Sequence, residues 1–187
     1  MVYADNAATT KMSRTAIDAM LPYMETHYGN PSSLYAFAQI VTEDLANARA
    51  TVAQCINAEP REIYFTSGGS EADNQAIISA AKLGAKKGKK HIISTKFEHH
   101  AVLHTLKKLE KEGWEVTLLD VHEDGVVRVD ELRDAIREDT CLVTVMFANN
   151  APCSPSPRLA RSAVSAVFHS TPTPFRPRGT CPSTSRP

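Results

Sequence analysis

The chain has 187 residues and a mass of 20.4 kDa, which suits one domain or a domain with an appendage. Hydrophobic residues make up 42% of it, which is enough for a core and excludes a wholly disordered chain, and the absence of any run of 18 apolar residues predicts no membrane-spanning helix. The net charge of zero conceals two parts: residues 1–150 carry 16 basic and 21 acidic side chains, whereas residues 151–187 carry five arginines and no acid.

Two helices are expected before residue 60, because apolar residues recur at helical spacing over 13–24 and over 39–56. Between them, YGNPSS at 28–33 has the composition of a turn-rich loop. Before them, DNAATT at 5–10 is a polar segment of small residues without a helical pattern.

Strand-like and helix-like segments alternate from residue 61 to residue 150. The last expected strand is apolar throughout, as strands buried on both faces are. Repeated β-α units predict an α/β fold with a mostly parallel sheet in three layers. The expected strands are 62–66, 91–94, 114–119 and 141–147, and the expected helices are 70–87, 99–112 and 129–137, with Gly88 and Gly113 ending the first two helices.

Ligands of an open parallel sheet bind beyond the carboxyl ends of its strands, where three loops are of interest. The first, TSGGSEAD at 66–73, opens a helix; its glycines let a ligand approach the backbone, and Ser70 and Asp73 are spaced as in a capping box. Free N–H groups and the helix dipole at such a site suit a phosphate, but a plain helix cap with a tight turn explains the same residues. The loop matches neither a Walker A sequence nor GxGxxG.

The other two loops carry histidines and asparagines. His99 follows a strand and begins a helix, where its ring could stack on a planar ligand, transfer a proton near neutral pH, or bond only to local backbone. His100 and His104 lie four residues apart, but no HExxH pattern surrounds them, so we expect no metal site. Asn149 and Asn150 follow the most apolar strand, where an asparagine either donates to a ligand oxygen or forms a turn.

The cysteines and the start of the chain bear on its compartment. Cys55 and Cys141 lie in apolar helix and strand patterns, where thiols are usually inert, and with Cys153 and Cys181 they form no CxxC pair. The first residues lack the basic and apolar regions of a secretory leader. We therefore expect a reduced, cytoplasmic chain without a zinc site.

Taken together, these segments resemble the class V aminotransferase family, and most closely the cysteine desulfurases of the NifS/IscS kind. The resemblance covers residues 1–150 without a large gap. One departure is Leu34-Tyr35, where many relatives carry a histidine. The segments that carry the resemblance are YADNAATT at 3–10, GNPSS at 29–33, PREI at 60–63, FTSGGSEADN at 65–74, Glu98-His99 and Asn149-Asn150.

The resemblance implies that residues 1–150 are the N-terminal arm and part of the large domain of a fold-type-I transferase that uses pyridoxal 5′-phosphate (PLP). Such enzymes convert L-cysteine to L-alanine and pass persulfide sulfur to iron–sulfur cluster assembly or thiolation pathways. They are homodimers that work with a sulfur-acceptor or scaffold protein. Carried over by position, Gly69 and Ser70 hold the PLP phosphate, His99 stacks on the pyridine ring and handles protons, and Asn150 lies near the phenolic oxygen and the substrate.

The family also needs groups that this chain lacks. These are an Asp beside the pyridine nitrogen, a Gln near it, a Lys that holds PLP covalently and a late Cys that accepts the sulfur. In the family all of them follow the Asn-Asn segment. We therefore expect the chain as written to bind PLP weakly or not at all and to lack desulfurase activity. Two alternatives to a cysteine desulfurase fragment remain. One is a fragment of a selenocysteine lyase, which shares the cofactor site, and the other is a non-catalytic frameshifted product.

Residues 151–187 hold 8 of the 11 prolines and begin with APCSPSP instead of the family's Glu-Ile-Gly. A Pro/Arg linker or a nucleic-acid-binding tail would have a similar composition. Because the segment has only five arginines and no lysine, we do not expect it to bind nucleic acid. Translation out of frame is a sharper hypothesis. From Val164 to Thr184, codons can be chosen so that the shifted frame reads ERGIPFHTDAVQAAGHLPIDV, which resembles the family's next segment and contains an Asp and a Gln. A tail of that origin should be disordered.

Overall fold

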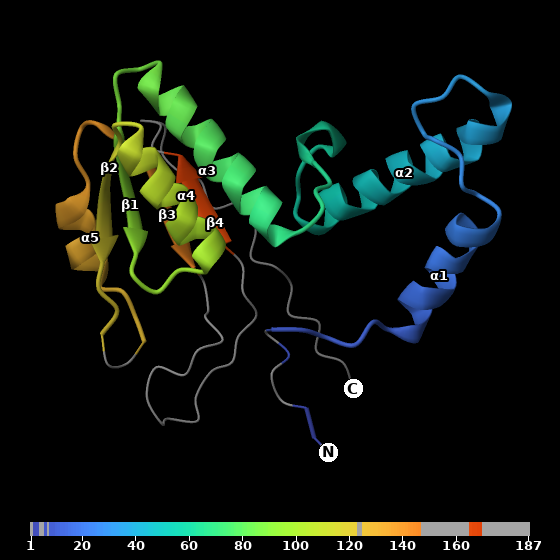
Figure 1. Cartoon of the computed structure of the whole chain (residues 1–187), viewed down its shortest axis with the longest axis horizontal. Helices are drawn as coiled ribbons and strands as arrows, with labels where there is room; N and C mark the ends of the chain where they lie inside the picture. Colours follow the sequence, from blue (N-terminus) through green and yellow to red (C-terminus); the bar gives the residue numbers. More distant parts are fainter. Residues whose placement is uncertain (1, 4–5, 7, 123–124, 147–164, 170–187) are drawn as a thin grey trace. The chain divides into compact units, whose positions relative to one another are not determined.

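The computed structural model describes residues 2–3, 6, 8–122, 125–146 and 165–169. It divides into two compact units, residues 1–72 and 73–187, and each unit is described by itself (Figure 1). Within the described residues, no helix combines the length and the apolar character that crossing a membrane requires.

The first unit contains the two expected helices, α1 (Arg14–Glu25) and α2 (Ala36–Cys55). Ser13 begins α1, because its Oγ accepts a hydrogen bond from the Ala16 N–H at 3.2 Å, as an N-cap residue does. The two helices contact through Tyr23, whose hydroxyl donates to the Asp44 carboxylate at 2.8 Å. α1 has no buried residue, and α2 buries only two alanines.

The strand expected at 62–66 is wrong. Pro60–Glu62 form a short 3-10 helix, η1, and the residues that follow pair with no strand. The guanidinium of Arg49, on α2, donates to the Ile63 carbonyl oxygen and lies 4.9 Å from the centre of the Phe65 ring. A β-rich run becomes a strand only beside a partner, and here a side chain of α2 holds the segment instead.

The second unit is built around a sheet with the order β2-β1-β3-β4. β1 pairs in parallel with β2 and with β3, whereas β4 runs antiparallel to β3. This confirms an α/β fold with a mostly parallel sheet. Its elements are β1 (His91–Thr95), α4 (His100–Lys111), β2 (Glu115–Leu119), α5 (Val129–Ala135), β3 (Thr140–Met146) and β4 (Ser165–His169), together with α3 (Gly69–Ala85), which starts in the last residues of the first unit.

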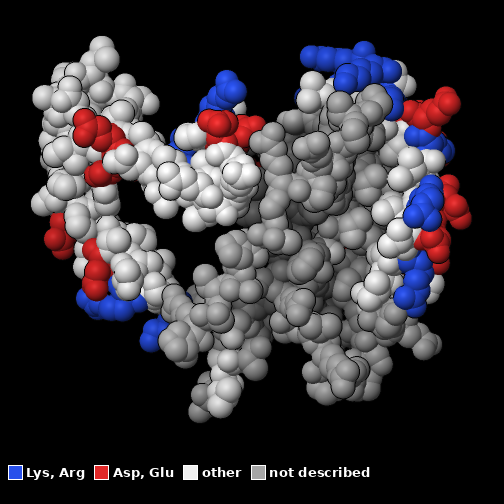
Figure 2. Space-filling view, turned by 180° about the vertical axis from the view of Figure 1, so that it is seen from behind, with Lys and Arg blue, Asp and Glu red and all other residues white. Residues whose placement is uncertain are grey.

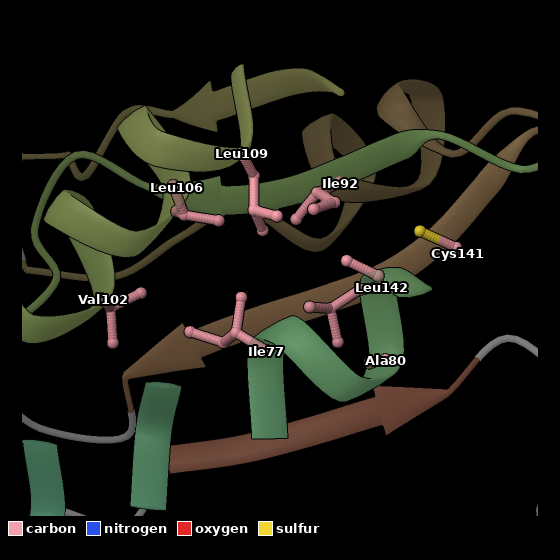
Figure 3. Packing of buried hydrophobic residues seen from close by; sticks show 9 residues of the cluster. Ile77, Ala80, Ile92, Val102, Leu106, Leu109, Cys141 and Leu142 are labelled. Atoms are coloured by element: carbon pink, nitrogen blue, oxygen red, sulfur yellow. The ribbon is translucent and has the colours of Figure 1, made fainter. Parts of the chain in front are cut away.

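Helices cover both faces of this sheet, which confirms the three layers. On one face, apolar side chains of α3 and α4 pack against β1 and β3. This cluster includes Ile77 of α3, Leu106 of α4, Ile92 of β1 and Leu142 of β3 (Figure 3). On the other face, Ile93, Leu119 and Val143 pack with Leu132 and Ala135 of α5.

Gly84 lets α3 approach the sheet closely. A Cβ at this position would lie 2.3 Å from the Cβ of Cys141, on β3, which no real contact allows. Two other glycines end helices as expected: Gly88 and Gly113 have φ values of 73° and 94°, in the region that favours glycine.

The expectation of a disordered tail differs from the structure at β4. Ser165–His169 pair with β3 from Met146 to Leu142. The segment SAVFH contains a β-branched and an aromatic residue, and a strand edge offers unpaired N–H and C=O groups to any chain that can reach it. The rest of 151–187 lies outside the described residues.

Candidate functional site

The loop that opens α3 is held by a different carboxylate from the one expected. Glu71 turns back, and its Oε2 accepts from the Ser67 backbone N–H at 2.7 Å and from the Ser67 hydroxyl at 2.6 Å. These bonds hold the pKa of Glu71 below its ordinary value. The capping box expected between Ser70 and Asp73 is therefore wrong, because α3 already begins at Gly69 and Ser70 is its second residue.

The first N–H groups of α3 point out of its N-terminus without acceptors inside the helix, as in any α-helix. Neither Gly68 nor Gly69 has a positive φ, and a Cβ on either would meet no heavy atom within 4 Å. The fold alone therefore does not require glycine at these positions. Because Cβ atoms of a helix tilt toward its N-terminus, a side chain at Gly69 would instead project toward the space that these N–H groups face. Such an open cradle fits a phosphate.

His99 is the N-cap residue of α4, at the carboxyl end of β1. Its Nδ1 accepts a hydrogen bond from the Ala101 N–H at 3.2 Å, while the residue is exposed. In the neutral ring, an Nδ1 that accepts leaves the proton on Nε2. The local backbone bond and an exposed ring thus occur together: the bond orients the imidazole, and Nε2 and the ring face remain accessible to a ligand.

Two carboxylates accompany His99. Glu98 is buried, and its Oε1 accepts from the Met146 N–H at 2.5 Å. Burial raises the pKa of Glu98 to about 7, and the charge of Asp73 adds to the effect. Asp73 on α3 is partly buried, which raises its pKa, while the charge of His99 lowers it. The second unit therefore gathers Asp73, Glu98 and His99 at the carboxyl end of the parallel strands.

The four expected cofactor residues fall in three places. Gly69 and Ser70 open α3 in the first unit, His99 caps α4 in the second, and Asn150 lies outside the described residues, as does Asn149. That these residues share one site stays a prediction.

The histidines at 100 and 104 form a pair on the surface of α4, with ring centres 5.9 Å apart. In the part of the chain that the structure describes, no group of three or more His, Cys, Asp or Glu side chains could hold a metal.

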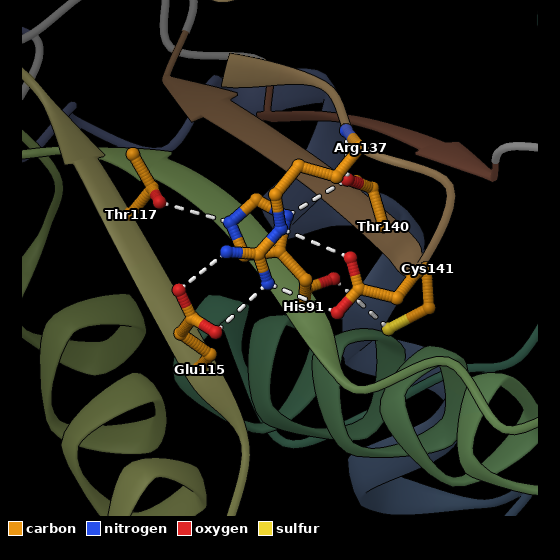
Figure 4. A network of polar contacts seen from close by, with 7 residues as sticks. His91, Glu115, Thr117, Arg137, Thr140 and Cys141 are labelled. Carbon is orange, nitrogen blue, oxygen red and sulfur yellow. Dashed lines mark hydrogen bonds and ion pairs between the residues drawn. The ribbon is translucent and has the colours of Figure 1, made fainter.

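A buried polar network at the opposite end of the sheet was not expected from the sequence. The His91 ring is fully buried at the start of β1, and its Nδ1 and Nε2 lie 2.8 Å from the Thr140 hydroxyl and 2.9 Å from the Thr117 hydroxyl (Figure 4). Arg137 lies beside it and pairs with Glu115 at 2.5 Å. Burial, and then the charge of Arg137, lower the pKa of His91. Its place at the amino end of a parallel strand gives this network a structural role.

The sequence contains a weak signal for the two buried ionisable residues, His91 and Glu98, whose burial was not expected. His91 is the polar first residue of an otherwise apolar strand, and Glu98 is the acid between that strand and the next helix. Neither position tells whether the side chain is buried, and burial is what perturbs both groups.

The comparisons with known proteins agree with one another. A family model described as Aminotransferase class-V matches residues 2–161. The cysteine desulfurase IscS of Clostridium botulinum (strain Hall) is 52% identical over 149 residues, which are 80% of this chain and 37% of that protein. IscS of Methanosarcina thermophila gives the same identity and coverage.

Solved structures give a similar result. A NifS-like protein has a TM-score of 0.74 and 37% identity, covering 78% of this chain and 40% of its own. DndA from Streptomyces lividans has a TM-score of 0.69 and 36% identity, with 80% and 42% covered. The chain thus spans well under half the length of the proteins that it matches.

Proposed function

Because the chain belongs to the aminotransferase class-V family, we propose that residues 2–150 are the N-terminal part of a PLP-dependent cysteine desulfurase. The observation that carries the proposal is the 52% identity to IscS over 149 residues. The whole enzyme would take L-cysteine to L-alanine as a cytoplasmic homodimer and hand the sulfur to an acceptor or scaffold protein. One solved relative is described as SspA in complex with cysteine, which supports this choice of substrate.

The start of α3 is the proposed phosphate site. The N–H groups of Gly69 and Ser70 and the Ser70 hydroxyl would donate to phosphate oxygens, and the helix dipole would favour the anion. The open space in front of Gly69 supports this assignment, because the fold gains nothing from glycine there. When bound, PLP supplies an electron sink for bond cleavage beside an amino group.

His99 is the proposed partner of the cofactor ring. The bond from the Ala101 N–H to Nδ1 holds the imidazole in one orientation, and the exposed ring could stack on a planar heterocycle. Its Nε2 would be the atom that holds or moves a proton. Asn150 would lie beside the phenolic oxygen and the substrate.

The phosphate assignment can be tested by titrating the labelled chain with PLP while following backbone amide shifts. The amides of Gly69, Ser70 and Glu71 should move with PLP and with inorganic phosphate, but not with pyridoxal, which lacks the phosphate. Ser70→Ala should weaken the response. Ser79→Ala, on an exposed position of the same helix, is the matched control and should leave it unchanged. Equal responses to PLP and pyridoxal would contradict the assignment.

The chain as written should not turn over L-cysteine, because no residue in it matches the Lys, Asp, Gln and late Cys of the family. Incubation of the purified chain with PLP and L-cysteine should yield no alanine above a protein-free control. Alanine formation that depends on the chain would show that this part of the proposal is wrong.

For residues 151–187, we propose translation out of frame. The similarity to IscS proteins covers 149 or 150 of the 187 residues and the family model ends at residue 161, although the relatives are far longer. The shifted reading also extends upstream, because codons for Ala151 to Val164 can be chosen to give TVQPIAEIGALCR, which runs directly into the reading given above. The joined reading has apolar residues at helical spacing and then a Gly before a short apolar run, which is one more helix and strand after β3.

The DNA sequence decides the matter. Third codon bases that permit the shifted reading across 152–184 support the proposal, and a run of codons that break it would overturn it.

A further inference from the structure

We propose that Glu98 is a positioning residue that fastens the loop carrying His99 to the carboxyl end of β3. The inference deepens the proposed function and rests on it for the identity of the ligand that His99 meets. The fastening itself is a property of the free chain and can be measured without any ligand.

The contact joins two strands beyond the point where their own pairing ends. The last register pair between β1 and β3 is Ile93 with Val143. Glu98 lies five residues after Ile93, yet its Oε1 accepts from the N–H of Met146, the last residue of β3. One side chain therefore links the two strand ends, and His99, the proposed partner of the cofactor ring, follows Glu98 directly.

The second oxygen of Glu98 indicates how this contact depends on charge. Oε2 is buried and has no hydrogen-bond partner among the described residues. A buried carboxylate with an unpartnered oxygen is costly, and the neutral acid costs less because only a polar group and not a charge is left without a partner. Three groups face the Glu98 carboxyl as a whole: the Asp73 carboxylate on α3, the backbone N–H of His99 and the Met146 N–H on β3. The Asp73 charge opposes ionisation of Glu98, and the two N–H groups favour ionisation.

Ionisation should shorten the hydrogen bond that Glu98 accepts while it is fastened. Oε1 can accept in either protonation state, but a hydrogen bond to a carboxylate is shorter and stronger than one to a neutral acid. Since the pKa of Glu98 is raised to about 7, the bond to Met146 should strengthen as the pH rises through that value. Because the pKa of the buried carboxyl lies above that of a solvated one, ionisation also favours release of Glu98 to water, so the loop that carries His99 should be held less firmly on the alkaline side.

The test uses amide NMR on the free full-length chain and three variants. In the wild type, the chemical shift of the Met146 amide proton should move downfield as the pH rises, with an apparent pKa near 7. Glu98→Gln keeps an acceptor of the same shape but cannot ionise, so this shift should become independent of pH while exchange of the amide with solvent stays slow. Glu98→Ala removes the acceptor, and exchange at Met146 should be about tenfold faster. The Ala101 amide, which donates to His99, should also exchange faster.

Glu110→Gln changes an exposed acid of α4 and is the matched control, which should behave as the wild type does. Slow exchange at Ile92 and Ile93, in the buried strand β1, verifies that each variant is folded. A Met146 shift in the wild type that ignores pH between 5.5 and 8.5, or unchanged exchange in Glu98→Ala, would overturn the inference. Because no ligand is added, this result is separate from the PLP titration that tests the proposed function.

Discussion

The two units of the molecule contain helices of similar sequence character but bury them very differently. In the second unit, Val102, Leu106 and Leu109 of α4 are only 1%, 2% and 1% exposed. In the first unit, Met24 of α1 is 66% exposed. On the face drawn in Figure 2, acidic and basic side chains lie next to one another on the second unit, whereas most of the visible atoms of the first unit belong to uncharged residues.

This difference teaches that helical periodicity predicts a helix without predicting what covers it. A helix of 12 residues such as α1 is marginal by itself, and most helix stability in proteins comes from packing of the apolar face. The free energy of unfolding should therefore be carried by residues 73–146. The tryptophan Trp114 packs against the core of the second unit, so its fluorescence reports on that unit.

The largest expected effect is that of Leu142→Ala. Leu142 is fully buried between the sheet and the helices α3 and α4, so its truncation leaves a cavity and should lower the free energy of unfolding by about 2–5 kcal/mol. Leu34→Ala, at a fully exposed position of the first unit, is the matched control and should change it by less than about 0.5 kcal/mol. Urea unfolding followed by Trp114 fluorescence measures both. Similar losses in the two variants would mean that the first unit has a core of its own.

The next largest effect on the free energy of unfolding is expected from Gly84, near the end of α3, compared with Gly69 at its start. Gly84→Ala places a Cβ within 2.3 Å of the Cys141 Cβ, so α3 must move away from β3, at a cost of about 1–3 kcal/mol. Gly69→Ala meets open space in the same helix and should stabilise it by about 0.5–1 kcal/mol. The same urea titration compares them, and equal effects of the two substitutions would contradict the close approach of α3 to the sheet.

Acidification should weaken the second unit through His91. Burial lowers the pKa of this histidine. Below about pH 6.5, His91 is therefore protonated in the unfolded chain while it is still neutral in the folded chain. Stability is then lost as the pH falls below that value, by at most about 1.4 kcal/mol per pH unit for one proton. The stability difference between the wild type and His91→Gln should therefore shrink from pH 7 to pH 5. A constant difference would show that His91 does not titrate with unfolding.

Glu98 acts in the opposite direction over part of this range. Its pKa in the folded chain, about 7, lies above the ordinary value of 4.5, so its contribution to stability is present at low pH and is lost as the pH rises through about 7. Glu98→Gln should consequently make the loss of stability on acidification steeper than in the wild type. An unchanged or shallower acid limb would mean that Glu98 is ionised in the folded chain.

The fold was predictable from the sequence where a pattern reflects packing within one element. The apolar run at 141–147 and the 3.6-residue spacing in 99–112 became β3 and α4, because each pattern is itself the record of a buried face. The strand expected at 62–66 failed because strands depend on partners, and the sequence does not show that Arg49 binds this segment. The roles of Glu98 and His91 were missed because burial of a polar group depends on residues distant in sequence.

The smallest expected effect tests whether the two units unfold separately. Ser13→Ala removes the N-cap of α1 and should cost that helix about 1 kcal/mol. Because α1 has no buried residue, we expect this loss to leave the core around Leu142 unaffected. Amide exchange should therefore accelerate in residues 14–25 while the urea midpoint seen by Trp114 stays where it is. If the midpoint moved together with the exchange of α1, the two units would unfold as one, and the contrast in burial would not divide the chain energetically.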